Sequence, residues 1–77
     1  MNKGRREALQ KISTNLEDLK LDIESLRDEE QEYADNMPES LQSSEKHDTA
    51  ENAVSSMDNA IDNIDEAISS IDESINS

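Results

Sequence analysis

Apolar residues recur at alternating spacings of three and four from Glu51 to the C-terminus, through the segments ENAVSSM, DNAIDNI, DEAISSI and DESINS. The apolar members of this row are Val54, Met57, Ile61, Ile64, Ile68, Ile71 and Ile75. Such spacing is typical of positions a and d of a coiled-coil heptad, written abcdefg. It predicts a long helix over about residues 44–75 that packs along one seam.

The first half of the chain carries a second apolar row with the same spacing. Its members are Leu9, Ile12, Leu16, Leu19, Ile23 and Leu26, and Tyr33 and Met37 continue it after Glu30 interrupts it. This row predicts a first helix over about residues 7–35. The basic residues 1–6 precede it as a flexible tip.

The two predicted helices are separated by a connection over about residues 36–43. Pro38 cannot lie inside a continuing helix and disfavours a helical residue before it, so we expect a break near Asn36 and Met37. Pro38 to Leu41 can form one short helical turn, and Ser43 or Ser44 is suited to cap the second helix. A short connection favours an antiparallel hairpin, so residues 7–77 form one all-α domain.

The predicted hairpin brings the termini together. Each helix of about 28 residues would be about 42 Å long. Folding back would place Lys3, Arg5, Arg6 and Lys11 beside Asp65, Asp72 and Glu73, so opposite charges support the antiparallel direction.

Small residues form a third regular row on the second helix. Ala53, Ala60, Ala67 and Ser74 share position g, directly before each a residue. They widen the apolar face from two rows to three, which a single partner helix cannot cover. We therefore expect a homodimer of hairpins that forms a four-helix bundle. The alternative explanation is that alanine merely raises helix propensity.

The composition shows a strong negative charge and excludes several classes of function. The 77 residues carry a formal net charge of -13 and include no cysteine and one glycine. Such a surface repels anionic membranes and nucleic acid, and no segment is long enough to span a bilayer. No apolar stretch follows the basic tip as in an export signal, so a cytoplasmic location is expected.

No pattern for catalysis or for a cofactor is present. His47 is the only histidine, and no nucleophile is placed beside it. The segment from Asp58 to Asn63 resembles a calcium loop but lacks the glycine and the ligand spacing that such a loop requires. We therefore expect no enzyme activity, no metal site and no cofactor.

The acidic rows are the candidate binding surface. Like charges four residues apart destabilise a helix, yet the second helix has no Lys or Arg after Lys46 to relieve them. The candidate partner-binding residues are Glu51, Asp58, Asp62, Asp65, Glu66, Asp72 and Glu73, with Asp28, Glu29, Glu30 and Glu32 on the first helix. A dimer would carry about one net negative charge per 1.6 Å along about 42 Å, and duplex DNA carries about one per 1.7 Å.

Small size, absence of cysteine, helical pattern and acidity together resemble the DNA-mimic and host-takeover proteins of bacteriophages, such as the HU inhibitors of Bacillus phages. The segment from Asn36 to Glu45 and the heptads after it also look like small helical proteins of Firmicute phages. The first resemblance implies a module that occupies the DNA-binding surface of a basic host protein such as the histone-like HU, in the host cytoplasm. The alternative is a coiled-coil adaptor that binds through its Ala/Ile seam.

Overall fold

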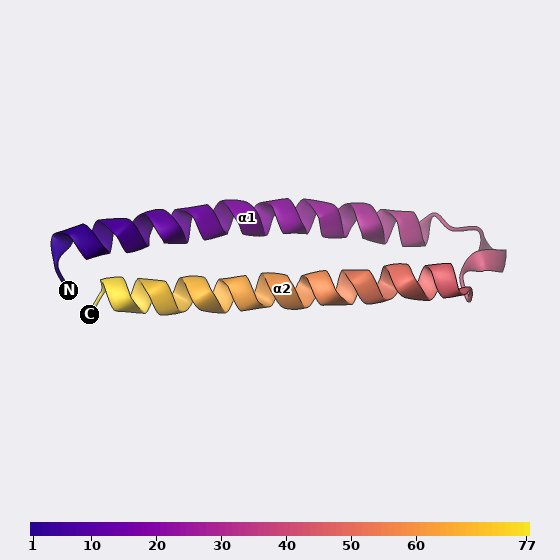
Figure 1. Ribbon diagram of the computed structural model, residues 1–77. Helices are drawn as coiled ribbons and strands as arrows, with labels where there is room; N and C mark the ends of the chain where they lie inside the picture. The colour runs from indigo at the N-terminus through magenta and orange to yellow at the C-terminus, as the bar shows by residue number, and fades with distance from the viewer.

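The computed structural model describes all 77 residues as one antiparallel helical hairpin (Figure 1). Helix α1 (Lys3–Asp35) and helix α2 (Glu45–Ile75) lie side by side, and the short 3₁₀ helix η1 (Glu39–Leu41) lies in the connection between them. The molecule measures 59 × 15 × 12 Å along its principal axes. The predicted all-α hairpin is confirmed.

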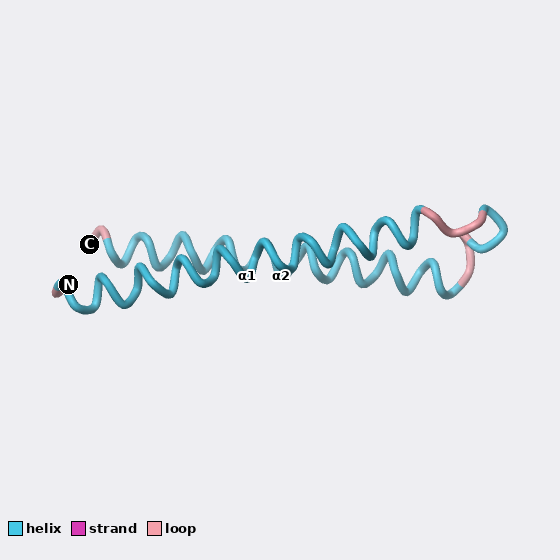
Figure 2. Tube along the Cα trace, turned by 90° about the horizontal axis from the view of Figure 1, so that it is seen from above, coloured by secondary structure: helices cyan, strands magenta, loops and turns pink.

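The two helices wind around each other. Seen from above, they cross near the middle of their length, and the two termini lie together at one end (Figure 2). A shallow crossing of this kind keeps facing rows of a heptad pattern in contact along the whole pair.

Helix α1 begins earlier than the heptad pattern predicted. It starts at Lys3, so most of the predicted flexible tip is helical. The side chain of Asn2 explains the difference, because its Oδ1 accepts a hydrogen bond of 2.8 Å from the backbone N–H of Arg5. An asparagine at this position satisfies one of the open donors of a helix start, so no apolar residue is needed there.

The connection follows the sequence prediction. Helix α1 ends at Asp35, and Pro38 directly precedes the turn of η1. Ser44 then caps α2, since its hydroxyl oxygen accepts a hydrogen bond of 3.3 Å from the backbone N–H of His47. The predicted break at Asn36 and Met37 and the predicted cap at Ser44 are both confirmed.

Helix α2 packs on its predicted seam. Val54, Ile61 and Ile68, at position a, are buried, and Ala50 at position d is buried as well. The remaining d residues of the seam, Met57, Ile64 and Ile71, are half-buried. One edge of this seam therefore stays partly open.

Helix α1 is rotated away from its predicted seam. The predicted d residues Ile12, Leu19, Leu26 and Tyr33 remain 47%, 53%, 57% and 50% exposed. The residues one position later in each heptad face α2 in their place: Ser13, Lys20, Arg27 and Ala34. Only the a residues Leu9, Leu16 and Ile23 keep the role the pattern gave them, and they are half-buried.

The resulting core is thin. No large side chain is completely buried, and Ala34 and Ala50 are the most enclosed apolar residues. Neither helix is both apolar and long enough to cross a membrane. Packing within one hairpin thus leaves much apolar side-chain surface in contact with water.

Candidate protein-interaction surface

Three polar contacts join the helices along one edge of the hairpin. The Ser13 hydroxyl donates to Asp72 at 3.3 Å, and the Lys20 ammonium donates to Asp65 at 2.8 Å. The Arg27 guanidinium donates to Asp58 at 2.9 Å. Each step of seven residues forward along α1 is matched by seven residues back along α2, so these six residues form one regular polar ladder.

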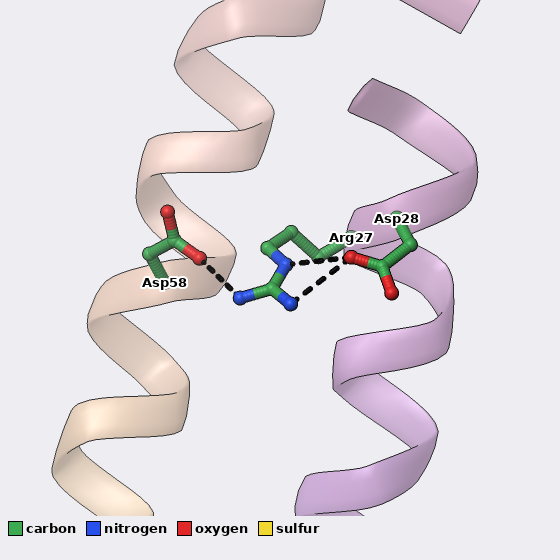
Figure 3. A network of polar contacts seen from close by, with 3 residues as sticks. All are labelled: Arg27, Asp28 and Asp58. Atoms are coloured by element: carbon green, nitrogen blue, oxygen red, sulfur yellow. Dashed lines mark hydrogen bonds and ion pairs between the residues drawn. The ribbon is translucent and has the colours of Figure 1, made fainter. Parts of the chain in front are cut away.

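Arg27 joins both helices through a single guanidinium group (Figure 3). Its Nη1 donates to Asp58 on α2, and its Nε and Nη2 donate to Asp28 on α1 at 3.1 and 3.0 Å. The hydrogen bonds from Arg27 to Asp58 and to Asp28 raise the pKa of Arg27 above its ordinary value. A guanidinium shared in this way fixes the positions of two carboxylates relative to each other.

Lys20 occupies the middle step of the ladder. Its side chain is only 18% exposed, because its methylene groups lie along the helix pair while the ammonium reaches Asp65. The hydrogen bond to Asp65 and the charges of Asp65, Glu17 and Glu24 raise the pKa of Lys20. One cation therefore lies among three carboxylates, and this edge stays negative overall.

The ion pairs between the helices are those of the ladder, and not the pairs expected between the N-terminal cations and the C-terminal acids. Lys3 contacts only Glu7 of its own helix, at 4.0 Å, and Arg5, Arg6 and Lys11 form no ion pair. The prediction that the N-terminal cations lie paired with the C-terminal acids is wrong. The cations that neutralise α2 come from Lys20 and Arg27 in the body of α1.

The candidate acidic residues of α2 fall into three groups. Asp58, Asp65 and Asp72 belong to the ladder and are held by α1. Glu51 lies 3.5 Å from Nε2 of His47. The exposed residues that form no ion pair are Asp62, Glu66 and Glu73.

The candidate residues of α1 are spread around the helix. Asp28 is held by Arg27, and Glu29 and Glu32 are exposed. Glu30 is half-buried at position a, where the apolar row is interrupted. Of these four carboxylates, Asp28 is joined to the acidic rows of α2, through the Arg27 guanidinium that it shares with Asp58.

All nine carboxylates of α2 lie on the neighbouring heptad positions e, b and f. They are Glu45, Asp48, Glu51, Asp58, Asp62, Asp65, Glu66, Asp72 and Glu73. At about 100° of rotation per residue, these rows share an arc of about 100°. We call this arc the acidic side of α2, and it begins at the polar ladder.

The ladder was not predicted, although the pattern contained a signal for it. Lys20 and Arg27 are seven residues apart, as are Asp58, Asp65 and Asp72. Two rows with equal spacing and opposite charge can pair all along an antiparallel hairpin. The apolar rows alone do not show which flank of α1 turns inward.

The site offers little else for chemistry. No three His, Asp or Glu side chains come close enough to hold a metal ion. The hollows on the surface are open, and the one beside the ladder is lined mainly by polar residues such as Gln10, Thr14 and Asp72. The arrangement is suited to long-range attraction of positive charge.

No protein-family model matches this chain, and the comparisons with curated proteins and with solved structures found no significant match.

Proposed function

We propose that this chain is a non-enzymatic acidic module that binds a basic surface of another protein. In this proposal it acts as a DNA mimic and occludes the DNA-binding surface of a basic host protein such as the histone-like HU. If the chain is encoded by a phage, this happens in the host cytoplasm. The observation that carries the proposal is the gathering of every carboxylate of α2 on one arc of the helix.

The ladder supports the proposal because it limits motion of the acidic side. Lys20 and Arg27 hold Asp65 and Asp58 from the neighbouring helix. The exposed carboxylates Asp62 and Glu66 lie on the adjoining rows and form no ion pair. A partner would therefore meet two aspartates that are held in place beside carboxylates that are free to pair with it, and preorganised charge lowers the cost of binding.

The charge density sets a limit on the mimicry. One copy carries a formal charge of -13 along 59 Å, a length that includes the connection as well as the helices. Two copies side by side would carry about one net charge per 2.3 Å, compared with about one per 1.7 Å in duplex DNA. A single hairpin has half that density, so the proposal is strongest for a dimer.

Competition with DNA tests the proposal. Purified HU is bound to a fluorescent DNA duplex, and the chain is added while the fluorescence anisotropy is followed. We expect the chain to displace the duplex, and to do so less well as salt rises, because long-range attraction is screened within about 10 Å at 0.1 M salt. Failure to displace the duplex at low salt would contradict binding to HU.

A pair of variants with equal net charge tests the surface. Asp62→Asn, Glu66→Gln and Glu73→Gln together remove three charges from the acidic side of α2. The control is Asp18→Asn, Leu21→Lys and Ser25→Lys, which changes the net charge by the same amount on the exposed outer surface of α1. We expect the first variant to compete much less well than the control. Equal losses would show that net charge alone, and not this surface, attracts the partner.

The adaptor alternative is favoured by one observation, the half-exposed apolar row on α1. In that case the alanine row and the open seam bind the partner, and acidity serves only solubility. Ala60→Glu and Ala67→Glu separate the two functions, because both residues lie outside the acidic side. An adaptor loses its partner in this variant, whereas the DNA mimic retains its acidic side.

A further inference from the structure

One side of the hairpin is apolar along most of its length. The rotation of α1 leaves the row formed by Ile12, Leu19, Leu26 and Tyr33 about half exposed. Four large side chains at seven-residue spacing are the pattern by which a helix packs against another helix. In the single hairpin no helix covers them.

The alanine row of α2 lies on the same side of the hairpin. Tyr33 lines a shallow hollow together with Glu30 of α1 and with Glu45, Lys46, Thr49 and Ala50 of α2. Lys46 shares heptad position g with Ala53, Ala60 and Ala67. The large row of α1 and the small row of α2 therefore border one surface, which we call the apolar side, and the polar ladder lies on the opposite edge.

The α2 half of the apolar side carries no charge after Glu45 and Lys46 at the start of the helix, although the chain is strongly acidic. The c positions of α2 that flank the alanine row are Thr49, Ser56, Asn63 and Ser70, and none is charged. The eight carboxylates of α2 that follow Glu45 lie on the other half of the helix. A basic partner would be attracted to that other half, so the apolar side requires an uncharged complement.

We propose that the apolar side binds a second copy of this chain, with the large row of each copy packed over the alanine row of the other. A second copy offers an alanine row to the large row of the first copy and a large row to its alanine row. The two rows can pair because they run over the same length in each hairpin. From Ile12 to Tyr33 the surface is about 32 Å long and two helices, about 20 Å, wide. Its outline of about 600 Å² is close to the ~800 Å² per partner of a standard interface.

Charge selects the orientation of the second copy. If α1 lay over α1 of the partner, the flanking residues Asp22 and Glu29 would approach their own copies. If α1 lies over α2 of the partner, they meet the uncharged flank of Thr49 to Ser70 instead. The two-fold axis then runs along the helices, and both connections lie at the same end of a four-helix bundle. This assembly does not depend on the proposed binding to HU.

Sedimentation equilibrium tests the assembly. We expect the unmodified chain to have twice its monomer mass at micromolar concentrations. Leu19→Glu with Leu26→Glu should raise the dissociation constant at least about a hundredfold, because charges then enter the apolar side. The matched control is Leu21→Glu, since Leu21 is 56% exposed on the same helix but lies on its outer surface. The control should remain dimeric.

Three results would overturn the proposal. They are a monomer at every concentration, a double variant that stays dimeric, and a control that dissociates as readily as the double variant. Circular dichroism checks that each variant is helical. If the double variant unfolds, the milder Leu19→Gln with Leu26→Gln takes its place under the same criteria.

A spin label in the connection tests the orientation in the unmodified interface. The chain has no cysteine, so Ser40→Cys introduces a unique labelling site. With both connections at one end, electron–electron distance measurements should give a separation far shorter than the 59 Å length of the hairpin. A separation close to that length would show the opposite orientation and overturn the packing of large rows over alanine rows.

Discussion

Helices α1 and α2 carry similar heptad patterns but use them differently. Helix α2 buries the a residues that its pattern predicts, such as Ile61, which is 6% exposed. Helix α1 turns one of its two apolar rows outward and places Lys20 and Arg27 against α2. A heptad repeat thus defines the rows on a helix, whereas the neighbouring helix determines which row is buried.

The acidic e row of α2 explains the rotation of α1. Asp58 and Asp65 lie at the edge of the α2 seam, and Arg27 and Lys20 follow the α1 apolar row by one position. Turning α1 toward this edge forms charge-assisted hydrogen bonds along the ladder. The cost is that Leu19 and Leu26 remain in water within one hairpin. In the proposed dimer they are covered by the second copy.

The largest expected difference is the loss of stability on truncating a residue of the buried row of α2 compared with the exposed row of α1. Ile61→Ala should lower the free energy of unfolding by about 2–5 kcal/mol, because a buried side chain is lost and a cavity remains. Leu19→Ala should cost less than about 1 kcal/mol at concentrations too low for association, since Leu19 is 53% exposed. Urea unfolding of both variants measures the difference. Equal losses would place Leu19 in the core of the hairpin.

A smaller difference in stability is expected between removing the cap of α2 and removing the cap of α1. Ser44→Ala should lower the free energy of unfolding by about 1 kcal/mol, because the capping bond to the His47 N–H is lost where α2 leaves the connection. Asn2→Ala removes the equivalent bond at the chain end and should cost less, because a terminal turn can fray without opening the hairpin. Thermal unfolding of both variants measures the order, and a larger loss for Asn2 would reverse it.

The smallest effect is a pH dependence that comes from Lys20. The hydrogen bond to Asp65 raises the pKa of Lys20 above its ordinary 10.5 in the folded state. The bond therefore contributes fully below pH 10.5, and its contribution is lost as the pH rises through the folded-state pKa. We expect the melting temperature to fall across this range in the unmodified chain.

Lys20→Arg is the control for this effect, since arginine stays charged there and can still pair with Asp65. Effects of high pH that do not involve residue 20 are common to both proteins and cancel in the comparison. An equal fall in the two melting temperatures would mean that the Lys20 bond adds nothing to stability.

The sequence predicted those features that depend on one helix or on the connection. The α2 seam, the break at Asn36 and Met37 and the cap at Ser44 are each determined by nearby residues. The start of α1 at Lys3 was missed because Asn2 acts through a hydrogen bond, while the heptad pattern records only apolar residues. Local signals therefore fixed the elements and their order.

The ladder and the outward row of α1 depend on both helices together. Nothing in α1 alone distinguishes the flank of Leu19 from the flank of Lys20, which lie on either side of the same a positions. Only the row of Asp58 and Asp65 on α2 makes the second flank the inner one. For the candidate site, the sequence predicted the acidic residues of α2 but not the ladder that holds three of them. The cations that pair with these acids lie in the body of α1 and not at its N-terminus, where the prediction placed them.

A charge exchange across the ladder tests the rotation of α1 most directly. Lys20→Asp with Arg27→Asp places carboxylates against Asp65 and Asp58, so the melting temperature should fall sharply. Adding Asp65→Lys and Asp58→Arg restores both pairs and the net charge, and most of the melting temperature should return. Arg6→Asp with Lys11→Asp makes the same net charge change without touching a cross-helix pair, and it should have little effect. A ladder variant no less stable than this control, or a fourfold exchange that fails to recover, would contradict the account.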